Sequence, residues 1–244
     1  MKGFIERKRE AGIFLSILGV GQGNYNDQLM QALAQNGNGT AAYVDTLNEA
    51  RKLLVDEASS TLFTIAKDVK IQVEFNPAQI AEYRLIGYET RALRREDFNN
   101  DKVDAGDIGS GHTVTAIYEI TPVGAPTLVG DLRYRPDAAA NADVRDGELG
   151  FLKLRYKLPA EQASKLVSVP ITPALETPIA AAPEDVRFSV SAAAFGQLLR
   201  GLPYIADYGY DDVLSLAQSA RGEDPYGYRA EFINLVRLAN SARP

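Results

Sequence analysis

The chain of 244 residues contains no cysteine and no tryptophan, and it has a single histidine, His112. Without cysteine there are no disulfides, no thiolate zinc ligands and no cysteine nucleophile. One histidine cannot supply a multi-histidine metal centre, and it cannot fill two separate histidine roles in acid–base chemistry. These absences exclude several common kinds of enzyme site, and they predict that His112 is a structural or surface residue.

The chain also has little that would attract nucleic acid or enter a membrane. Its 26 lysines and arginines against 32 aspartates and glutamates give a formal charge of −6. The global basic field that supplies most non-specific DNA affinity is therefore missing. The segment 1–12 is charged throughout, which fits neither a signal peptide nor a membrane anchor. The chain contains 45% hydrophobic and 24% charged residues. This composition predicts a globular protein.

The first sixty residues alternate between helical and strand patterns. Residues 4–9 are helical in character, and the apolar run at 13–18 indicates a strand buried on both faces. A helix with an apolar stripe follows a glycine-rich turn, and a second strand is expected at 40–44, before a third helix. Two strands joined by a helix predict a parallel pair with a right-handed crossover. The capping candidates are Asn24 or Asn26 for the second helix and Asp45 or Thr46 for the third.

Beyond residue 60 the apolar spacing changes from the helical period to strict alternation. Val69, Ile71, Val73 and Phe75 alternate with polar residues, which is typical of a half-buried antiparallel strand. Several similar segments follow, and together they predict an antiparallel β-sandwich. Its strands are expected at 69–75, 83–92, 112–121, 151–158 and 165–169.

A connector rich in proline and alanine, residues 170–183, separates this part from a helical tail. In the tail, helices are expected from Glu184 to Gly201, from Tyr210 to Ala220 and from Pro225 onward. The sequence therefore predicts an α+β protein with three parts. These are an incomplete α/β part at 1–60, an antiparallel β-sandwich at 61–175 and a C-terminal helical segment at 184–244 that packs on the β domain.

A glycine-rich turn, Gly19–Asn24, lies between the first strand and the second helix. In a dinucleotide-binding fold, such glycines let a pyrophosphate approach the helix N-terminus, and an acid after the next strand, here Asp45, holds the ribose. However, Asn24 stands where the third glycine is needed, and the pattern contains only two parallel strands. A tight strand-to-helix turn is therefore the main interpretation, with nucleotide binding as a weaker alternative.

An acidic loop covers residues 97–107. Its first part, Asp97–Asp101, supplies oxygens at the first three odd positions of a calcium-binding loop pattern. The position that should be glycine is Lys102, and the position of the last ligand, a glutamate, is Ile108. The pattern therefore favours an acidic, solvated loop over a calcium site.

Tyrosines and charged residues gather near the C-terminus. Such a cluster is typical of a protein-binding surface, because tyrosine offers a large contact area with a polar end. The alternative is that the rings pack between helices and only their hydroxyls reach water. The candidates for the surface are Tyr204, Tyr208, Tyr210, Tyr226, Tyr228 and Arg229.

Longer motifs resemble a known family. The start of the chain is similar to the last third of a von Willebrand factor type A domain, and the remainder is similar to the C-terminal extension of a bacterial family of such proteins. The first resemblance rests on Gly12–Asn26, Gly37–Gly39 and Leu47–Arg51. The second rests on Ala66–Pro77, Tyr83–Glu89, Gly111–Glu119, Asp131–Tyr134, Phe195–Gly201 and Asp224–Phe232.

The resemblance implies a doubly wound α/β module that binds partners through Mg²⁺ or another divalent ion. In the family the ion is held by an Asp-x-Ser-x-Ser loop, a threonine and a further aspartate, and all of these would precede Met1. No metal ligand is therefore assigned in this chain, and a divalent metal is expected only together with the preceding part of the domain. Members of the family are commonly envelope proteins with a lipoprotein-type signal, so the resemblance also suggests the bacterial cell envelope.

We therefore expect a non-enzymatic region that binds a protein partner in envelope-associated assembly or adhesion. The alternatives are a hydrolase or transferase with its site in the β-rich part and, more weakly, nucleotide binding at Gly19–Asn24. A parallel pair with its helices cannot close an α/β core and leaves an open edge. The edge is expected to be covered by preceding strands, by the β-rich part, by another copy or by a separate fragment, and the chain alone is expected to dimerise or aggregate.

Overall fold

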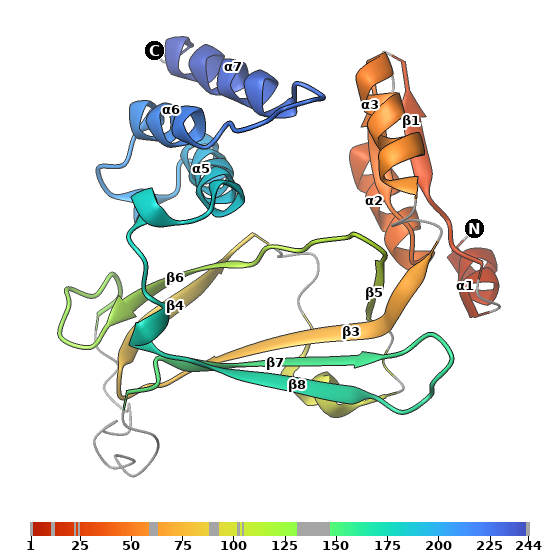
Figure 1. Ribbon diagram of the computed structural model, residues 1–244, viewed down its shortest axis with the longest axis horizontal. Coiled ribbons are helices and arrows are strands. Elements are labelled where there is room, and N and C mark those ends of the chain that lie inside the picture. The colour runs from red at the N-terminus through yellow and green to blue at the C-terminus, as the bar shows by residue number, and fades with distance from the viewer. Residues whose placement is uncertain are drawn as a thin grey trace. The chain divides into compact units, whose positions relative to one another are not determined.

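The structure is a computed structural model of the chain (Figure 1). It describes residues 2–10, 13–21, 23, 25–58, 63–87, 93–101, 103, 105–130 and 147–242. The described elements combine helices with antiparallel sheets, which confirms the α+β class. The finer assignments, a partial von Willebrand factor A-type domain and a β-sandwich, stay predictions.

The N-terminal elements follow the expected order of helix, strand, helix, strand and helix. They are α1 (Lys2–Glu10), β1 (Ile17–Val20), α2 (Asp27–Asn36), β2 (Ala41–Val44) and α3 (Leu47–Arg51), the last continued by a π-helical turn, Lys52–Asp56. Strands β1 and β2 pair in parallel, as predicted. Asn26 and Thr46 are the caps of α2 and α3, because their side-chain oxygens accept from Leu29 N at 3.0 Å and Glu49 N at 3.2 Å.

The first strand differs from its prediction. It begins at Ile17 rather than Ile13, and its side chains are not buried on both faces, since Val20 is 78% exposed. Before β1 the chain passes close to the turn after α2. Leu15 N donates to Gly37 O at 2.9 Å, and a Cβ at Gly39 would lie only 1.9 Å from Leu15 O. Glycine is therefore required at position 39 by a close approach of two backbones.

The β-rich part forms a four-stranded sheet with the order β5-β3-β7-β8 and a separate antiparallel pair of β4 and β6. The strands are β3 (Thr64–Phe75), β4 (Ile80–Ile86), β5 (Gly106–Gly109), β6 (Ile117–Pro122), β7 (Gly150–Lys157) and β8 (Lys165–Ile171). All five expected strands have a counterpart, although residues 88–92 of the second lie outside the described residues. Strand β5 was not predicted, and residues 112–116 precede β6 instead of forming part of it.

The tail contains the three expected helices, α5 (Glu184–Leu199), α6 (Tyr210–Ser219) and α7 (Tyr228–Ser241). Short 3₁₀ turns at Pro173–Leu175 and Ile179–Ala181 interrupt the connector before α5, and a third, Pro203–Ile205, precedes α6. The last helix begins at Tyr228 and not at Pro225. The reason is local, because Gly227 has a left-handed φ of 80° and the Asp224 carboxylate accepts from the first amides of the helix.

The helices enclose an apolar core. Val213 and Val236 have no exposed surface, and Tyr210 beside them is 8% exposed. The rings of Phe195 and Phe232 meet edge to face with centroids 5.4 Å apart. Because this core draws on all three helices, it fixes their packing.

The chain divides into two compact units, each made of separate stretches. The first comprises Met1–Ile71, Leu93–Thr113 and Leu154–Val167, and the second comprises Gln72–Ala92, Val114–Lys153 and Ser168–Pro244. The predicted boundaries at 1–60, 61–175 and 184–244 stay a prediction. None of the helices in the described part of the chain has the length and apolar character that a membrane crossing requires.

Candidate functional site

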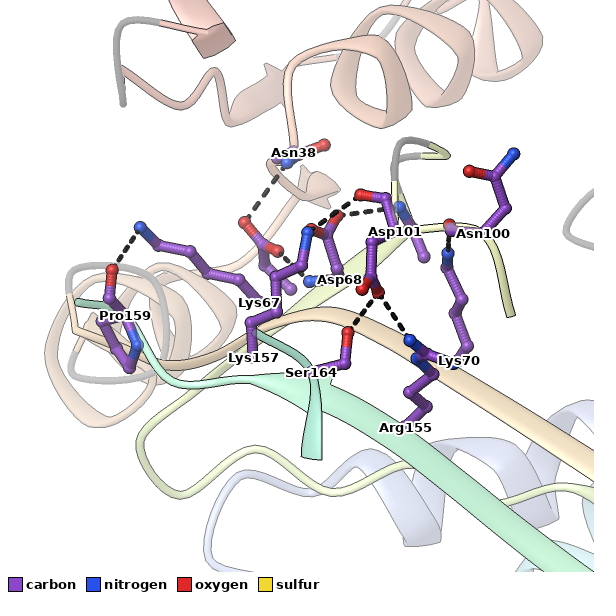
Figure 2. Close-up of polar contacts among 12 residues, drawn as sticks. Asn38, Lys67, Asp68, Lys70, Asn100, Asp101, Arg155, Lys157, Pro159 and Ser164 are labelled. Carbon is purple, nitrogen blue, oxygen red and sulfur yellow. Dashed lines mark hydrogen bonds and ion pairs between the residues drawn. The ribbon is translucent and has the colours of Figure 1, made fainter. Parts of the chain in front are cut away.

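A network of charged side chains in the first unit joins β3 and β7 to the acidic loop (Figure 2). Lys70 is only 3% exposed, and its Nζ donates to the carbonyl oxygens of Asp97, at 3.2 Å, and Asn100. Lys157 is 8% exposed, and its Nζ donates to Asp68 Oδ2 at 2.7 Å and to the carbonyl oxygen of Asp101 at 2.9 Å. The two ammonium groups are thus buried with oxygen partners, as a buried charge requires.

Asp101 is the acid on which most of these contacts converge. Figure 2 shows its carboxylate between the hydroxyl of Ser164 and the guanidinium of Arg155, whose Nη2 lies 3.0 Å from Asp101 Oδ1. The hydrogen bond from Ser164 lowers the pKa of Asp101 most, partial desolvation opposes this shift, and the charge of Arg155 adds to it. An aspartate in this setting stays ionised at neutral pH and is a poor proton donor.

Asp107 links three segments of the same unit. Its Oδ1 accepts from Asp68 N at 3.1 Å, and its Oδ2 accepts from Asn38 Nδ2 at 3.2 Å. Asp68 and Asn38 both have φ of 50°, in the left-handed region that few residues other than glycine adopt. The pairing of β3 with β5 shifts register between Ala66 and Val69, so Asp68 lies at an irregularity of the strand.

The acidic loop is partly solvated, in line with its composition, since Asn99, Asn100 and Asp101 are exposed. Asp101 and Asp107 are also bonded to other parts of the unit, Asp101 to Arg155 and Lys157 on β7 and Asp107 to the backbone of Asp68 on β3. The calcium pattern includes Lys102, which lies outside the described residues. Among the residues that are described, no group of three or more His, Cys, Asp or Glu is placed to hold a metal ion. We call this network the clamp, because it fixes the acidic loop to strands β3 and β7. Its residues are Asp68, Lys70, Asp101, Asp107, Arg155, Lys157 and Ser164.

The glycine-rich turn lies beside a hollow of about 370 Å³ that is lined by Gly21, Gly23 and Tyr25, among others. The ring of Tyr25 packs against Gly19 and leaves little room for a side chain there, since a Cβ at Gly19 would lie 2.4 Å from Tyr25 Cε2. Gly21 and Gly23 have φ of 88° and 142°, as a tight turn requires. Asn24, which replaces the third glycine of the nucleotide pattern, lies outside the described residues.

Three of the tyrosines named as a binding surface lie in different surroundings. Tyr204 is 40% exposed, and the guanidinium carbon of Arg84 lies 4.5 Å from the centre of its ring. Tyr208 is half-buried against the helical core, and desolvation together with the nearby Asp212 raises its pKa. Tyr210 belongs to the core, so its assignment to a surface is corrected.

The other candidates lie at the start of α7. Tyr226 and Tyr228 are half-buried. Arg229 pairs with Asp185, donates to Ala220 O at 2.8 Å and lies 4.9 Å from the centre of the Phe188 ring. Its guanidinium is therefore occupied in joining α5, α6 and α7. The six residues do not share one exposed surface, because the apolar periodicity of the tail places several of them between helices.

His112 is exposed, as expected, and its backbone N donates to Gly109 O at 3.1 Å. Sequence analysis did not identify a further hollow of about 360 Å³ between α6 and α7. Two arginines, Arg221 at the end of α6 and Arg237 in α7, line it. The available signal was the spacing of Asn234 and Arg237, which places them on one face of α7 beside the apolar stripe.

Comparisons with known proteins identify relatives for nearly the whole chain. The profile of a family described as "Uncharacterized protein YfbK, C-terminal" matches residues 60–242. A curated protein of Escherichia coli (strain K12), "Uncharacterized protein YfbK", is 47% identical over 240 residues. The alignment covers 98% of this chain and 41% of that protein, so the chain spans less than half of its relative's length. No solved structure matches the chain.

Proposed function

Since the chain belongs to the family of YfbK C-terminal regions, we propose that it is a non-enzymatic, protein-binding region of a bacterial von Willebrand factor A protein. In this proposal the region takes part in assembly or adhesion at the cell envelope. The observation that carries the proposal is the apolar surface of the N-terminal α/β elements. The order of these elements and the parallel pairing of β1 with β2 support the von Willebrand factor A assignment.

Large apolar side chains are exposed on these elements and on the π-helical turn that follows them. The most exposed are Leu47 at 85%, Val20 at 78%, Val55 at 65%, Leu54 at 60%, Phe4 at 57% and Leu29 at 52%. Single exposed apolar residues are ordinary, but several on one small element group indicate a surface that another protein segment covers. Parallel strands are also normally buried on both faces within a larger sheet. The proposed occupant is therefore a set of further strands and helices of the same α/β fold.

The ionisable groups of the first unit support a binding role over catalysis. Lys70 and Lys157 spend their donors on backbone carbonyls and on Asp68, and Asp101 is held ionised by its neighbours. General acid–base catalysis needs a group whose pKa lies near the working pH and which can reach a substrate. Asp101, whose pKa is lowered, does not meet the first requirement.

The experiment measures the association state of the purified chain by light scattering over a wide range of concentration. We expect concentration-dependent self-association through the uncovered α/β surface. Substitution of Val20 and Leu47 by lysine should reduce it, because charges on an edge and on an apolar face oppose pairing. The matched control is Leu175→Lys, which changes a residue that is 63% exposed in the second unit.

Two results would count against the proposal. One is a monomer at every concentration whose β1 and β2 amides are protected from hydrogen exchange. The other is catalytic turnover that disappears in Asp101→Asn, which would favour the hydrolase or transferase alternative. Saturable binding of ATP or NAD at the turn Gly19–Asn24 would instead favour the nucleotide alternative.

A further inference from the structure

The hollow between α6 and α7 has a composition that is unusual for so acidic a chain. It is lined by Gln218 and Arg221 from the end of α6 and by Ala230, Ile233, Asn234 and Arg237 from α7. The lining thus combines two arginines and two side-chain amides with an apolar floor, Ala230 and Ile233. We propose that this hollow binds a carboxylate-bearing segment of an acidic partner protein. This inference rests on the proposed protein-binding function and names the chemistry of a partner.

Three other arginines of the second unit, Arg84, Arg187 and Arg229, are used by the fold. Arg84 pairs with Glu119 and donates to Gln197. Arg187 donates to the carbonyl oxygens of Ala180 at 3.0 Å and Ser219 at 3.1 Å. As described above, Arg229 likewise joins the three helices. Each of these guanidiniums closes a contact between segments, which is the ordinary structural use of arginine in this unit.

Arg221 and Arg237 are different. Both are exposed, and the partner of Arg237 Nη1 among the described residues is Asn234 Oδ1 on its own helix, at 2.9 Å. Within the described residues, no partner of the Arg221 guanidinium is found. No acidic side chain is among the residues that line the hollow, and the Asp224 carboxylate accepts from Arg229 N at 3.2 Å and Ala230 N at 2.8 Å. The positive charge of the hollow is therefore available to a ligand.

The chemistry of the lining selects the ligand. The planar guanidinium matches a carboxylate or phosphate in a two-bond geometry, and side-chain amides add further donors. Ile233, which is 4% exposed, and Ala230 offer apolar contact at the same site. A glutamate or aspartate side chain of a protein can use both parts, since its methylene carbons contact the floor while its carboxylate reaches the arginines. A bare phosphate ion can use only the arginines.

The test measures the fluorescence anisotropy of a labelled hexaglutamate peptide titrated with the full chain. We expect saturable binding that weakens by about tenfold or more in Arg221→Gln/Arg237→Gln, because two charge-assisted contacts are lost. The matched control is Arg94→Gln/Arg95→Gln, which removes the same charge from two exposed arginines of the first unit. The control should bind as the unaltered chain does. The formal charge of −6 repels the peptide as a whole, so binding has to come from a local site.

Arg237→Lys provides a second test that keeps the charge. It should bind more weakly than the unaltered chain and more tightly than the double variant, because lysine lacks the planar fork. Circular dichroism must show the same helix content in all variants. If the double variant does not fold, Arg237→Lys alone carries the test, and unchanged affinity in it would overturn the proposal.

Three other results would also overturn it. These are no saturable peptide binding, an equal loss of affinity in the double variant and its control, and displacement of the peptide by an equal concentration of inorganic phosphate. The outcome is distinct from that of the proposed function. If self-association responds to Val20→Lys while the peptide does not bind, the inference fails and the protein-binding role stands. If peptide binding depends on the two arginines and the α/β surface does not associate, the arginine hollow stands as a binding site and the α/β surface no longer carries the proposed function.

Discussion

The charged clamp of the first unit and the helical core of the second are stabilised by different interactions. In the core, Val213 and Val236 lose all contact with water, and aromatic rings pack around them. In the clamp, Lys70 and Lys157 are buried because backbone carbonyls and Asp68 accept their hydrogen bonds. The stability of the core depends on the apolar area that is buried and on how well the side chains fit together. The stability of the clamp depends on each buried charged group having a hydrogen-bond partner.

This difference determines how each region responds to substitution. Truncating a buried apolar side chain lowers the free energy of unfolding, because apolar burial is lost and a cavity is left behind. Removing one member of a buried ion pair costs more than the pair itself contributed, since the remaining charge loses its partner. Protonation of Asp101 changes the stability of the clamp, because the folded state lowers the pKa of this group. The comparison therefore predicts large effects of truncation in the core, smaller effects of single changes in the clamp, and a response of the clamp to acid through Asp101.

The largest effect is expected for Phe232→Ala in the core. Phe232 contacts the rings of Phe188 and Phe195 at centroid distances of 5.2 and 5.4 Å. Its loss should reduce the free energy of unfolding by about 3 kcal/mol, measured by urea denaturation followed by circular dichroism. The control is Leu238→Ala on the same helix, where the side chain is 64% exposed. Equal destabilisation by the two substitutions would show that the aromatic contacts do not form the core.

A smaller effect is expected for Lys157→Met in the clamp. The substitution keeps most of the volume but leaves Asp68 without its 2.7 Å partner, and it should cost about 2 kcal/mol in the same assay. Asp68→Asn added to this variant should restore part of the loss, because it removes the unpaired charge. The control is Lys153→Met on the same strand. Lys153 lies 3.7 Å from Glu74, whose side chain is 58% exposed, so the cost there should be below about 0.5 kcal/mol.

The predicted coupling in the clamp would be contradicted if the effects of the two substitutions on the free energy of unfolding were additive. If Lys157→Met and Asp68→Asn destabilise independently, with no recovery in the double variant, then the two side chains are not energetically coupled. The clamp would in that case be a set of separate surface contacts, and the contrast with the core would disappear.

Local patterns predicted the helical tail and the parallel pair well. Asn26 and Thr46 were each one of two candidate caps, because capping depends on residues only a few positions away. The end of α5 before Gly201 followed from the same kind of signal. Strand β5 was missed because Gly106–Gly109 contains a single apolar residue, Ile108, and it forms only where β3 supplies a partner.

The clamp could not be predicted, because its partners are far apart in the sequence. Alternation along β3 placed Lys70 on the solvent side, yet it is buried while Ile71 is 45% exposed. The cause is the carbonyl oxygens of Asp97 and Asn100, which lie 27 and 30 residues away. Charge and alternation are properties of a segment, whereas pairing of a buried charge is a property of the fold. The arginine hollow escaped prediction for the same reason, since it needs the packing of α6 on α7.

The smallest expected effect concerns the response of the clamp to acid. The folded state lowers the pKa of Asp101, so this group stabilises the fold above the pKa of an unfolded aspartate, about 3.9. That contribution is lost as the pH falls through the lower pKa of the folded state. In Ser164→Ala the strongest cause of the shift is removed. The pKa of Asp101 should therefore rise toward its ordinary value, and the acid-side loss of stability that depends on Asp101 should shrink.

The direct measurement is an NMR titration of the Asp101 carboxyl carbon in the unaltered chain and in Ser164→Ala. Ser219→Ala is the control, because its hydroxyl bonds only Leu216 O in the second unit and should leave the titration unchanged. The effect is small because the Asp101 side chain is 44% exposed and water screens its charges. An Asp101 pKa that is the same in all three proteins would show that Ser164 does not hold the carboxylate. Loss of the shift in Ser164→Ala alone would establish that the clamp, unlike the core, depends on the protonation state of a single carboxyl group.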